Sequence, residues 1–246
     1  MDAALNLTAG GDPRLVTTQW GVVASAAEEG TPEAKAALED LYRVYCYPVY
    51  AFIRRKGYSR EDAQDLTQDF FVHLLEKAAL ARASPQRGRF RSFLLGALTY
   101  FLGHAAERAG AQKRGGGCRL FSLDEEVAEG RYQLAAPEAL TAEKIFATRW
   151  AAALVEAALA RLRRELEAEG KGRVFGALQG FLVGGEDTSY QQAADALGLG
   201  LGSLKTLIYR MRGRYRALLR DEVARTVTTP DEVEEELRFL RAALRG

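Results

Sequence analysis

The amino-acid sequence predicts an all-α protein with two small helical domains, a flexible acidic linker between them, and a C-terminal helical extension. Apolar residues recur three and four positions apart through much of the 246 residues, which is the period of amphipathic helices. The segment 118–143 is rich in acidic residues, as expected of a solvated tether. Further on, two amphipathic stretches flank a turn at Gly198, which predicts that the second domain contains a helix-turn-helix.

The composition argues against membrane-spanning, secreted and disulfide-rich proteins. No apolar run approaches the roughly 20 residues that a membrane-spanning helix needs. The N-terminus lacks a basic region followed by an apolar core, so we expect no secretory signal. The two cysteines, Cys46 and Cys118, lie far apart without metal-ligand spacing, which suits a reducing compartment. We therefore expect a cytoplasmic protein without a membrane partner.

No pattern of catalytic residues is evident. The two histidines, His73 and His104, form no zinc site with the two distant cysteines. The chain has no Walker loop, no dinucleotide-binding fingerprint and no nucleophile elbow. We expect no catalytic residue, no metal and no cofactor, so that the protein is not an enzyme and acts through binding.

The net charge of +1 conceals a strong segregation of charge along the chain. The block 87–119 holds seven lysines and arginines against one acid, Glu107, and the block 203–220 holds six against none. Between them, 122–143 holds six acids and only one basic residue, Arg131. Two basic blocks separated by an acidic one predict two contacts with a polyanion and a connector that avoids it.

The second basic block lies in the predicted helix-turn-helix, 188–220. Ser189 is a predicted N-cap of the first helix, Gly198 ends that helix, and Ser203 is a predicted cap of the second helix. One face of the second helix is apolar, whereas the other is basic and carries no acid, as a reader of the DNA major groove requires. An ordinary helical hairpin with a solvated basic face is the alternative. The candidate DNA contacts are Ser203, Lys205, Thr206, Tyr209, Arg210 and Arg214.

The first domain is expected to follow an N-terminal extension, 1–33. A helical pattern begins at Pro32 and continues to Arg55, with a kink or break expected at Pro48. Ser59 is a predicted cap of the next helix. Its inward residues are Ala63, Leu66, Thr67, Phe70 and Leu74. Its outward residues are Asp65, Gln68, Asp69 and Val72, with Asp62 and Phe71 at the edges. This acidic face indicates either a docking surface for a basic partner or a simply solvated surface.

The first basic block includes an aromatic-rich helix that begins near Phe90. Phe90, Phe93, Ala97, Tyr100 and His104 share one stripe, so we expect most of these rings, and His104, in the core. The candidate contacts with nucleic acid are then the basic and polar residues Arg87, Arg89, Arg91, Arg108, Gln112, Lys113 and Arg114.

Several of these segments together resemble a known family. The sequence from Tyr58 to Phe71 with 73–76, the run 88–95 (GRFRSFLL) and the run 112–117 (QKRGGG) resemble bacterial extracytoplasmic-function (ECF) sigma factors of the sigma-70 family. In that family they correspond to the segments that bind core RNA polymerase, melt the promoter and contact its −10 element. The helix-turn-helix stands where the family has its −35-reading domain.

The resemblance implies a promoter-specific initiation factor whose partners are core RNA polymerase and promoter DNA. It assigns 34–117 to polymerase and the −10 element, 118–143 to a linker, and 144–224 to the −35 element. The polymerase-binding residues would be Asp62, Asp65, Gln68, Asp69, Phe71 and Val72. The linker could be a solvated tether or could run through basic channels of the polymerase. The resemblance leaves open whether an anti-sigma factor is a further partner.

Two other functions remain open on the sequence alone. A helix-turn-helix regulator that acts without polymerase would explain the basic helix but would leave the acidic face at 60–76 unexplained. A non-DNA protein, such as a helical bundle that sequesters a partner, would make both basic faces incidental. Binding to core polymerase separates the first function from these two.

The residues 225–246 predict a C-terminal acidic amphipathic helix. Thr229 is a predicted N-cap, Pro230 follows it, and Glu232 comes three residues after the cap. The apolar stripe comprises Val233, Leu237, Leu240 and Leu244. This helix either caps the second domain or, as a second hypothesis, folds back on a basic DNA-binding face and restrains it.

Overall fold

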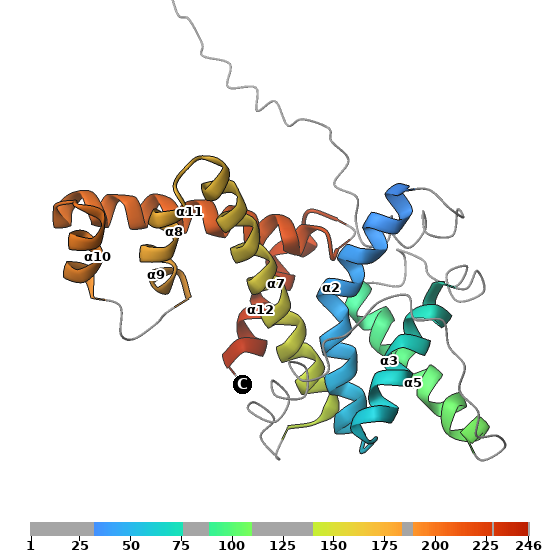
Figure 1. Ribbon diagram of the computed structural model, residues 1–246. Coiled ribbons are helices and arrows are strands. Elements are labelled where there is room, and N and C mark those ends of the chain that lie inside the picture. Colours follow the sequence, from blue (N-terminus) through green and yellow to red (C-terminus); the bar gives the residue numbers. More distant parts are fainter. Residues whose placement is uncertain (1–31, 76–88, 110–139, 184–188, 228, 246) are drawn as a thin grey trace, which may run out of the picture.

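Every described secondary-structure element is an α-helix in the computed structural model, which confirms the predicted all-α class (Figure 1). The structure describes residues 32–75, 89–109, 140–183, 189–227 and 229–245, and no strand occurs in these ranges. None of the helices in the described ranges has the length and apolar character needed to cross a membrane. Nearly all of the predicted N-terminal extension, apart from residues 32 and 33 at the start of α2, and nearly all of the predicted linker lie outside the described residues.

The first three described helices form the N-terminal part of the fold. They are α2 (Pro32–Arg55), α3 (Arg60–Leu75) and α5 (Phe90–Ala109). Helix α2 has the predicted ends, and it continues through Pro48, so a break there is excluded and the alternative, a kink, stays a prediction. The side chains of Tyr45, Val49 and Phe52, on both sides of the proline, are buried in one core, and this packing outweighs the single backbone hydrogen bond that proline removes.

Helix α3 begins with the predicted N-cap. The Asp62 backbone N–H donates to Ser59 Oγ at 3.0 Å, and the Ser59 hydroxyl donates to the Asp62 carboxylate at 2.8 Å. The predicted inward face is confirmed, because Ala63, Thr67, Phe70 and Leu74 are buried and Leu66 is half-buried.

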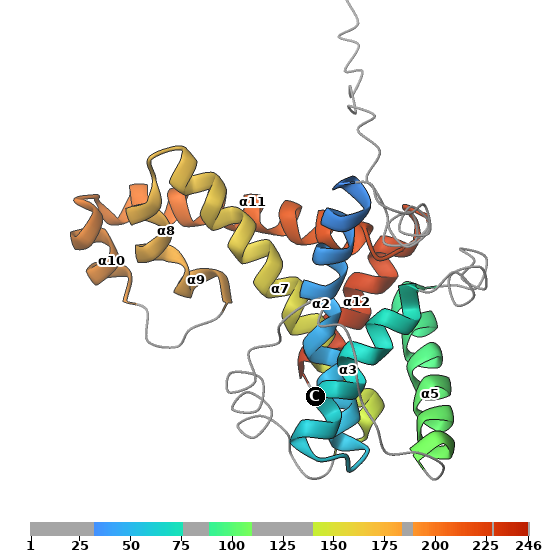
Figure 2. The same ribbon diagram turned by 45° about the vertical axis from the view of Figure 1, so that its right-hand side comes forward.

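Helix α5 buries a different stripe from the predicted one. Its buried residues are Phe90, Leu94, Leu98, Phe101 and Leu102. Tyr100 is 58% exposed and His104 is also exposed, so the prediction that they lie in the core is wrong. Two stripes at helical spacing overlap in this sequence, and the stripe with more large aliphatic side chains packs against α2 and α3. Figure 2 shows α5 beside α3.

The C-terminal part of the fold contains six described helices. They are α7 (Ala142–Ala168), α8 (Gly172–Leu178), α9 (Gly180–Val183), α10 (Tyr190–Leu197), α11 (Leu201–Ala224) and α12 (Glu232–Arg245). Thr141 caps α7 by accepting a hydrogen bond from the Lys144 backbone N–H at 3.3 Å, and Gly170, with φ 71°, follows its end.

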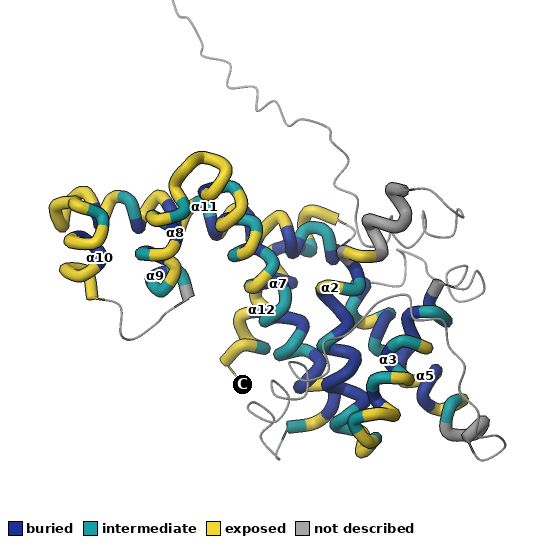
Figure 3. Tube along the Cα trace, in the orientation of Figure 1, coloured by how far each residue is buried: buried dark blue, intermediate teal, exposed yellow. Residues whose placement is uncertain are grey.

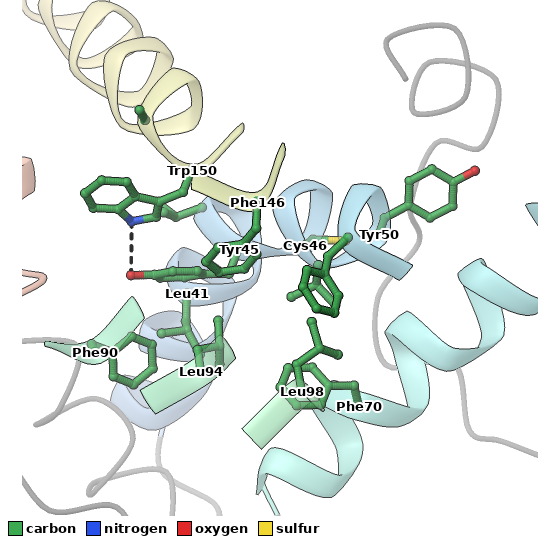
Figure 4. Packing of buried hydrophobic residues seen from close by; sticks show 14 of the residues in the cluster. Leu41, Tyr45, Cys46, Tyr50, Phe70, Phe90, Leu94, Leu98, Phe146 and Trp150 are labelled. Carbon is green, nitrogen blue, oxygen red and sulfur yellow. Dashed lines mark hydrogen bonds between the residues drawn. The ribbon is translucent and has the colours of Figure 1, made fainter. Parts of the chain in front are cut away.

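Two hydrophobic clusters form the interior, and α7 contributes to both (Figure 3). The first cluster joins α2, α3, α5, the start of α7, the end of α11 and α12. At its centre the Trp150 indole N–H donates to the Tyr45 hydroxyl at 3.3 Å (Figure 4). The second cluster joins the end of α7 to α8, α9, α10 and α11. The predicted division of the chain into domains stays a prediction.

The two helix caps and the turn of the α10–α11 pair follow the predicted chemistry at two of three positions. Ser189 Oγ accepts from the Gln192 backbone N–H at 3.4 Å, and Gly198 adopts a left-handed conformation with φ 65°. The predicted cap at Ser203 is wrong, because α11 begins at Leu201 with Gly200 as its N-cap. Gly200 is extended, and its carbonyl accepts the Leu204 N–H at 3.0 Å, which places Ser203 inside the first turn.

Helix α12 begins at Glu232, so the predicted N-cap at Thr229 is wrong, but one half of the predicted capping box forms. The Thr229 backbone N–H donates to the Glu232 carboxylate at 3.0 Å. Val233, Leu237 and Leu240 are buried, but Leu244 is 45% exposed, so the apolar stripe ends one turn earlier than predicted.

Replacement of Gly198 by alanine tests the left-handed turn. A Cβ at Gly198 would meet nothing within 4 Å, so its cost is the strain of the positive φ, about 1–2 kcal/mol. Gly198→Ala should therefore lower the free energy of unfolding in urea by that amount. The matched control is Gly213→Ala, also in open space but inside α11, which should raise it by about 0.5–1 kcal/mol. Equal effects of the two variants would contradict the turn.

Burial predicts an unreactive thiol at Cys46. The side chain is 4% exposed, and burial raises the pKa of its thiol to about 12. In a Cys118→Ser variant, Cys46 should react with a disulfide reagent at pH 8 only as fast as the protein opens, since the thiolate is the attacking species. Reaction as fast as that of the urea-unfolded chain would contradict the described core.

Candidate nucleic-acid interface

One face of α11 presents a group of polar and basic side chains to solvent. Lys205, Thr206 and Arg210 are exposed, and Tyr209 is 76% exposed. The opposite face is buried through Leu204, Ile208, Met211, Tyr215 and Leu218. The predicted division of this helix into an apolar and a basic face is therefore confirmed, and Ser203 is exposed beside the basic face. We call Ser203, Lys205, Thr206, Tyr209 and Arg210 the α11 outer face.

The positive charge of the α11 outer face is uncompensated within the described part of the chain. Neither Lys205 nor Arg210 forms an ion pair with a described residue, and α11 contains no acid before Asp221. The Thr206 hydroxyl donates to the Gly202 carbonyl at 3.1 Å, and its oxygen can still accept a hydrogen bond. Unpaired cations on an exposed helix face attract phosphate groups through a salt-dependent interaction.

The short helices behind α11 support the orientation of this face. The Arg212 guanidinium donates to the Phe181 carbonyl at 3.0 Å, which ties α11 to α9. The Arg173 guanidinium donates to the Ala196 carbonyl at 3.1 Å, which ties α8 to α10. The rings of Phe181 and Tyr190 lie 4.7 Å apart, joining α9 to α10. The α11 outer face is thus presented by a packed group of helices.

Arg214 does not belong to the α11 outer face, contrary to the sequence-based prediction. Its guanidinium pairs with Glu165 at 2.8 Å and with Glu169 at 2.7 Å, both on or next to α7. The side chain is 34% exposed. Arg214 lies within one turn of the apolar residues Met211 and Leu218, and it holds α11 against α7.

The two described arginines at the start of α5 are also engaged by acidic residues. Arg89 pairs with Glu235 at 2.5 Å and with Glu236 at 3.1 Å. Arg91 pairs with Glu236 at 2.6 Å, and its guanidinium lies 3.5 Å from the ring centroid of Phe239. In this arrangement α12 covers both side chains, and their predicted contact with nucleic acid stays a prediction.

The remaining candidates of the first basic block are not placed by the structure. Arg87, Gln112, Lys113 and Arg114 lie outside the described residues, and the side chain of Arg108 is not described. Two exposed rings of α5, which the sequence assigned to the core, join the candidate residues instead. Tyr100 and His104 have ring centroids 4.3 Å apart, and exposed aromatic rings of this kind can stack on unpaired bases. The same sequence contains a second, leucine-rich stripe, and this stripe would have indicated that these two rings are exposed.

The acidic face of α3 is present with one correction. Asp62, Asp65 and Asp69 are exposed, and Gln68 and Val72 are half-buried. Phe71, predicted at the edge of this face, is 4% exposed, with its ring 4.9 Å from Tyr42 and 5.7 Å from Phe70. Tyr42 of α2 packs over this side of α3, so Phe71 is buried in the core and not exposed at the surface as predicted.

An apolar groove of about 890 Å³ lies between α5, the start of α7 and the end of α12. Leu95, Tyr100, Phe146 and Phe239 line it. Its one acidic lining residue, Glu143, pairs with Lys56 at 3.1 Å. Hydrogen bonds from its own backbone N–H and from Lys56 lower the pKa of the Glu143 carboxyl.

Within the described ranges, no group of histidine, cysteine and acidic side chains could hold a metal ion.

None of the protein-family models, curated proteins or solved structures compared with this chain matches it. The function proposed below is therefore supported by the arrangement of the described side chains and by the resemblance of the sequence segments.

Arg210 and Arg214 allow the α11 outer face to be tested with two variants of the same helix. Arg210→Ala should weaken binding of duplex DNA by about fivefold or more and leave the melting temperature unchanged, because Arg210 has no ion-pair partner among the described residues. Arg214→Ala should lower the melting temperature by several degrees, about 1 kcal/mol, with little direct effect on DNA affinity. Fluorescence anisotropy and thermal unfolding measure both properties, and the reverse pattern would contradict the assignment.

Proposed function

We propose that this protein is an RNA polymerase sigma factor of the ECF type, which directs promoter-specific initiation of transcription. The observation that carries the proposal is the α11 outer face, whose basic and polar side chains are exposed and uncompensated on a helix that follows a tight turn. The order of the segments that resemble the family supports it. In this proposal two helical domains, joined by the acidic linker 118–143, contact the −10 and −35 elements.

The α10–α11 pair would read duplex DNA. With α11 in the major groove, the Arg210 guanidinium can donate two hydrogen bonds to a guanine, which discriminates by about 1–3 kcal/mol against other bases. Lys205 would pair with a backbone phosphate. Thr206 and Ser203 can donate and accept hydrogen bonds, and the exposed Tyr209 ring can contact a thymine methyl group or a sugar.

The α5 region would act on the opened strand. Unstacking a base costs a few kcal/mol, which contacts with exposed rings and with phosphates can offset. Tyr100 is exposed on this helix, and Arg87, Arg108, Gln112, Lys113 and Arg114 belong to the same basic block. These side chains are our candidates for contacts with the −10 element.

The acidic face of α3 would dock on core polymerase. Asp65 and Asp69 are exposed on one side of the helix, with Asp62 one turn earlier. A basic polymerase surface would be attracted to this face, and complementary charge raises the rate and the specificity of association. Phe71 would contribute to docking indirectly, because its buried ring packs against Tyr42 and holds α3 on α2.

A capture experiment with purified core polymerase tests the docking face. Asp65→Lys should abolish capture, because it places a cation in an exposed acidic face and disturbs no described contact. The matched control is Glu39→Lys, an exposed acid of α2 with no ion pair among the described residues, which should retain capture. Arg210→Ala should also retain it. Normal capture by Asp65→Lys would show that the docking face is misassigned.

The same experiment separates the proposal from a regulator that acts alone. If the unaltered chain binds duplex DNA through Arg210 but does not capture core polymerase, the helix-turn-helix regulator is the better assignment. If it does neither, both DNA-binding functions are excluded.

A further inference from the structure

Helix α12 directs three consecutive glutamates toward three arginines on other parts of the chain. Glu234 pairs with Arg220 of α11. Glu235 pairs with Arg89, next to the start of α5, and Glu236 pairs with both Arg89 and Arg91. Successive side chains of a helix point about 100° apart, so a single turn of α12 reaches both basic regions that the sequence predicts for DNA.

The third glutamate, Glu236, is an anchor. Its side chain is fully buried, and Arg91, which is 14% exposed, donates to it at 2.6 and 3.3 Å. The Arg91 guanidinium also lies over Phe239 at 3.5 Å and within 5.6 Å of the Trp150 ring. Breaking such a buried pair by removing one partner is strongly destabilising, so this contact holds α12 to the rest of the fold.

The first two glutamates, by contrast, form pairs at the surface. The side chains of Glu234 and Glu235 are 59% and 57% exposed. A hydrogen bond and the charge of Arg220 lower the pKa of the Glu234 carboxyl, so this carboxylate is ionised at neutral pH. Exposed pairs contribute little to stability, and a guanidinium binds phosphate oxygens with the same two-pronged geometry as carboxylate oxygens. A nucleic-acid backbone could therefore replace both glutamates.

The apolar attachment of α12 is short. Val233, Leu237 and Leu240 are buried in the first cluster, whereas Leu244 is exposed. Near the C-terminal end, the Thr148 hydroxyl donates to the Ala243 carbonyl at 3.0 Å. One helical stripe and the Glu236 anchor hold this helix in place.

We propose that α12 is an internal mimic of a nucleic-acid backbone, which occupies Arg89 and Arg220 until single-stranded DNA takes the place of Glu235 and Glu234. The identity of the competing ligand rests on the proposed function. DNA that binds at the start of α5 must break the Glu235 pair, so α12 lowers the affinity of the free protein for DNA. The Glu236 anchor takes no part in this exchange, so α12 stays against Trp150, whose ring centroid lies 5.9 Å from that of Phe239.

Two variants of equal charge test this competition. Glu235→Gln removes the pair with Arg89, whereas Asp231→Asn removes one exposed negative charge that has no ion pair among the described residues. Both raise the net charge by one, so their difference isolates the pair. Glu235→Gln should bind labelled single-stranded DNA of mixed sequence about threefold more tightly than Asp231→Asn, the effect of one exposed ion pair.

Trp150 provides a second readout that is independent of affinity. In a Trp20→Phe background it is the one remaining tryptophan of the chain. Its emission should stay unchanged when single-stranded DNA binds, because the Glu236 anchor keeps Phe239 against the buried ring. A red shift would show that the whole helix is released, which contradicts an exchange of the two surface glutamates alone. Circular dichroism checks that each variant is folded.

The outcomes distinguish this proposal from the proposed function. If DNA binds but the two variants have equal affinities, the mimic is wrong, while DNA binding by the chain stands. If no variant binds single-stranded or duplex DNA, the mimic is overturned together with the DNA-binding part of the proposed function. Capture of core polymerase then reports separately on the docking face.

Discussion

The long helix α7 is the constraint on which the rest of the structure depends. Its buried residues extend from Ala142 to Leu166 and enter both hydrophobic clusters. Trp150 fills the first cluster and bonds to Tyr45, whereas Leu162 lies in the second. A helix that is packed at both ends cannot rotate one cluster without disturbing the other. The acidic face of α3 and the outer face of α11 are therefore held on one continuous framework (Figure 1).

The end of α11 and α12 provide a second connection between the same parts. Val223 lies in the first cluster although it belongs to the helix that carries the α11 outer face. The pairs of Glu234 and Glu235 with Arg220 and Arg89 add electrostatic links to this connection. The arrangement with α12 in place thus combines one exposed basic surface with one that is covered. The α11 outer face is therefore accessible to solvent, whereas the basic region at the start of α5 is covered by α12.

Local chemistry made much of this fold predictable, whereas choices between distant partners did not. The caps at Ser59 and Ser189 and the turn at Gly198 depend on neighbouring residues, and the sequence predicts them correctly. The sequence misplaces Tyr100 because two stripes of similar spacing compete in α5, and the helices that pack on α5 decide between them. It misplaces Phe71 because the ring of Tyr42, on another helix, covers it. Arg91 and Arg214 form ion pairs with acidic residues on other helices. A count of charges along the sequence cannot reveal such pairs.

Run-off transcription with purified core RNA polymerase tests the central claim most directly. Core enzyme lacking its own specificity subunit would be mixed with this protein and a library of promoter fragments. We expect transcripts of defined length from a subset of fragments that share two spaced sequence elements, and none of defined length from core enzyme alone. The same random background of transcripts with and without the protein would contradict the central claim.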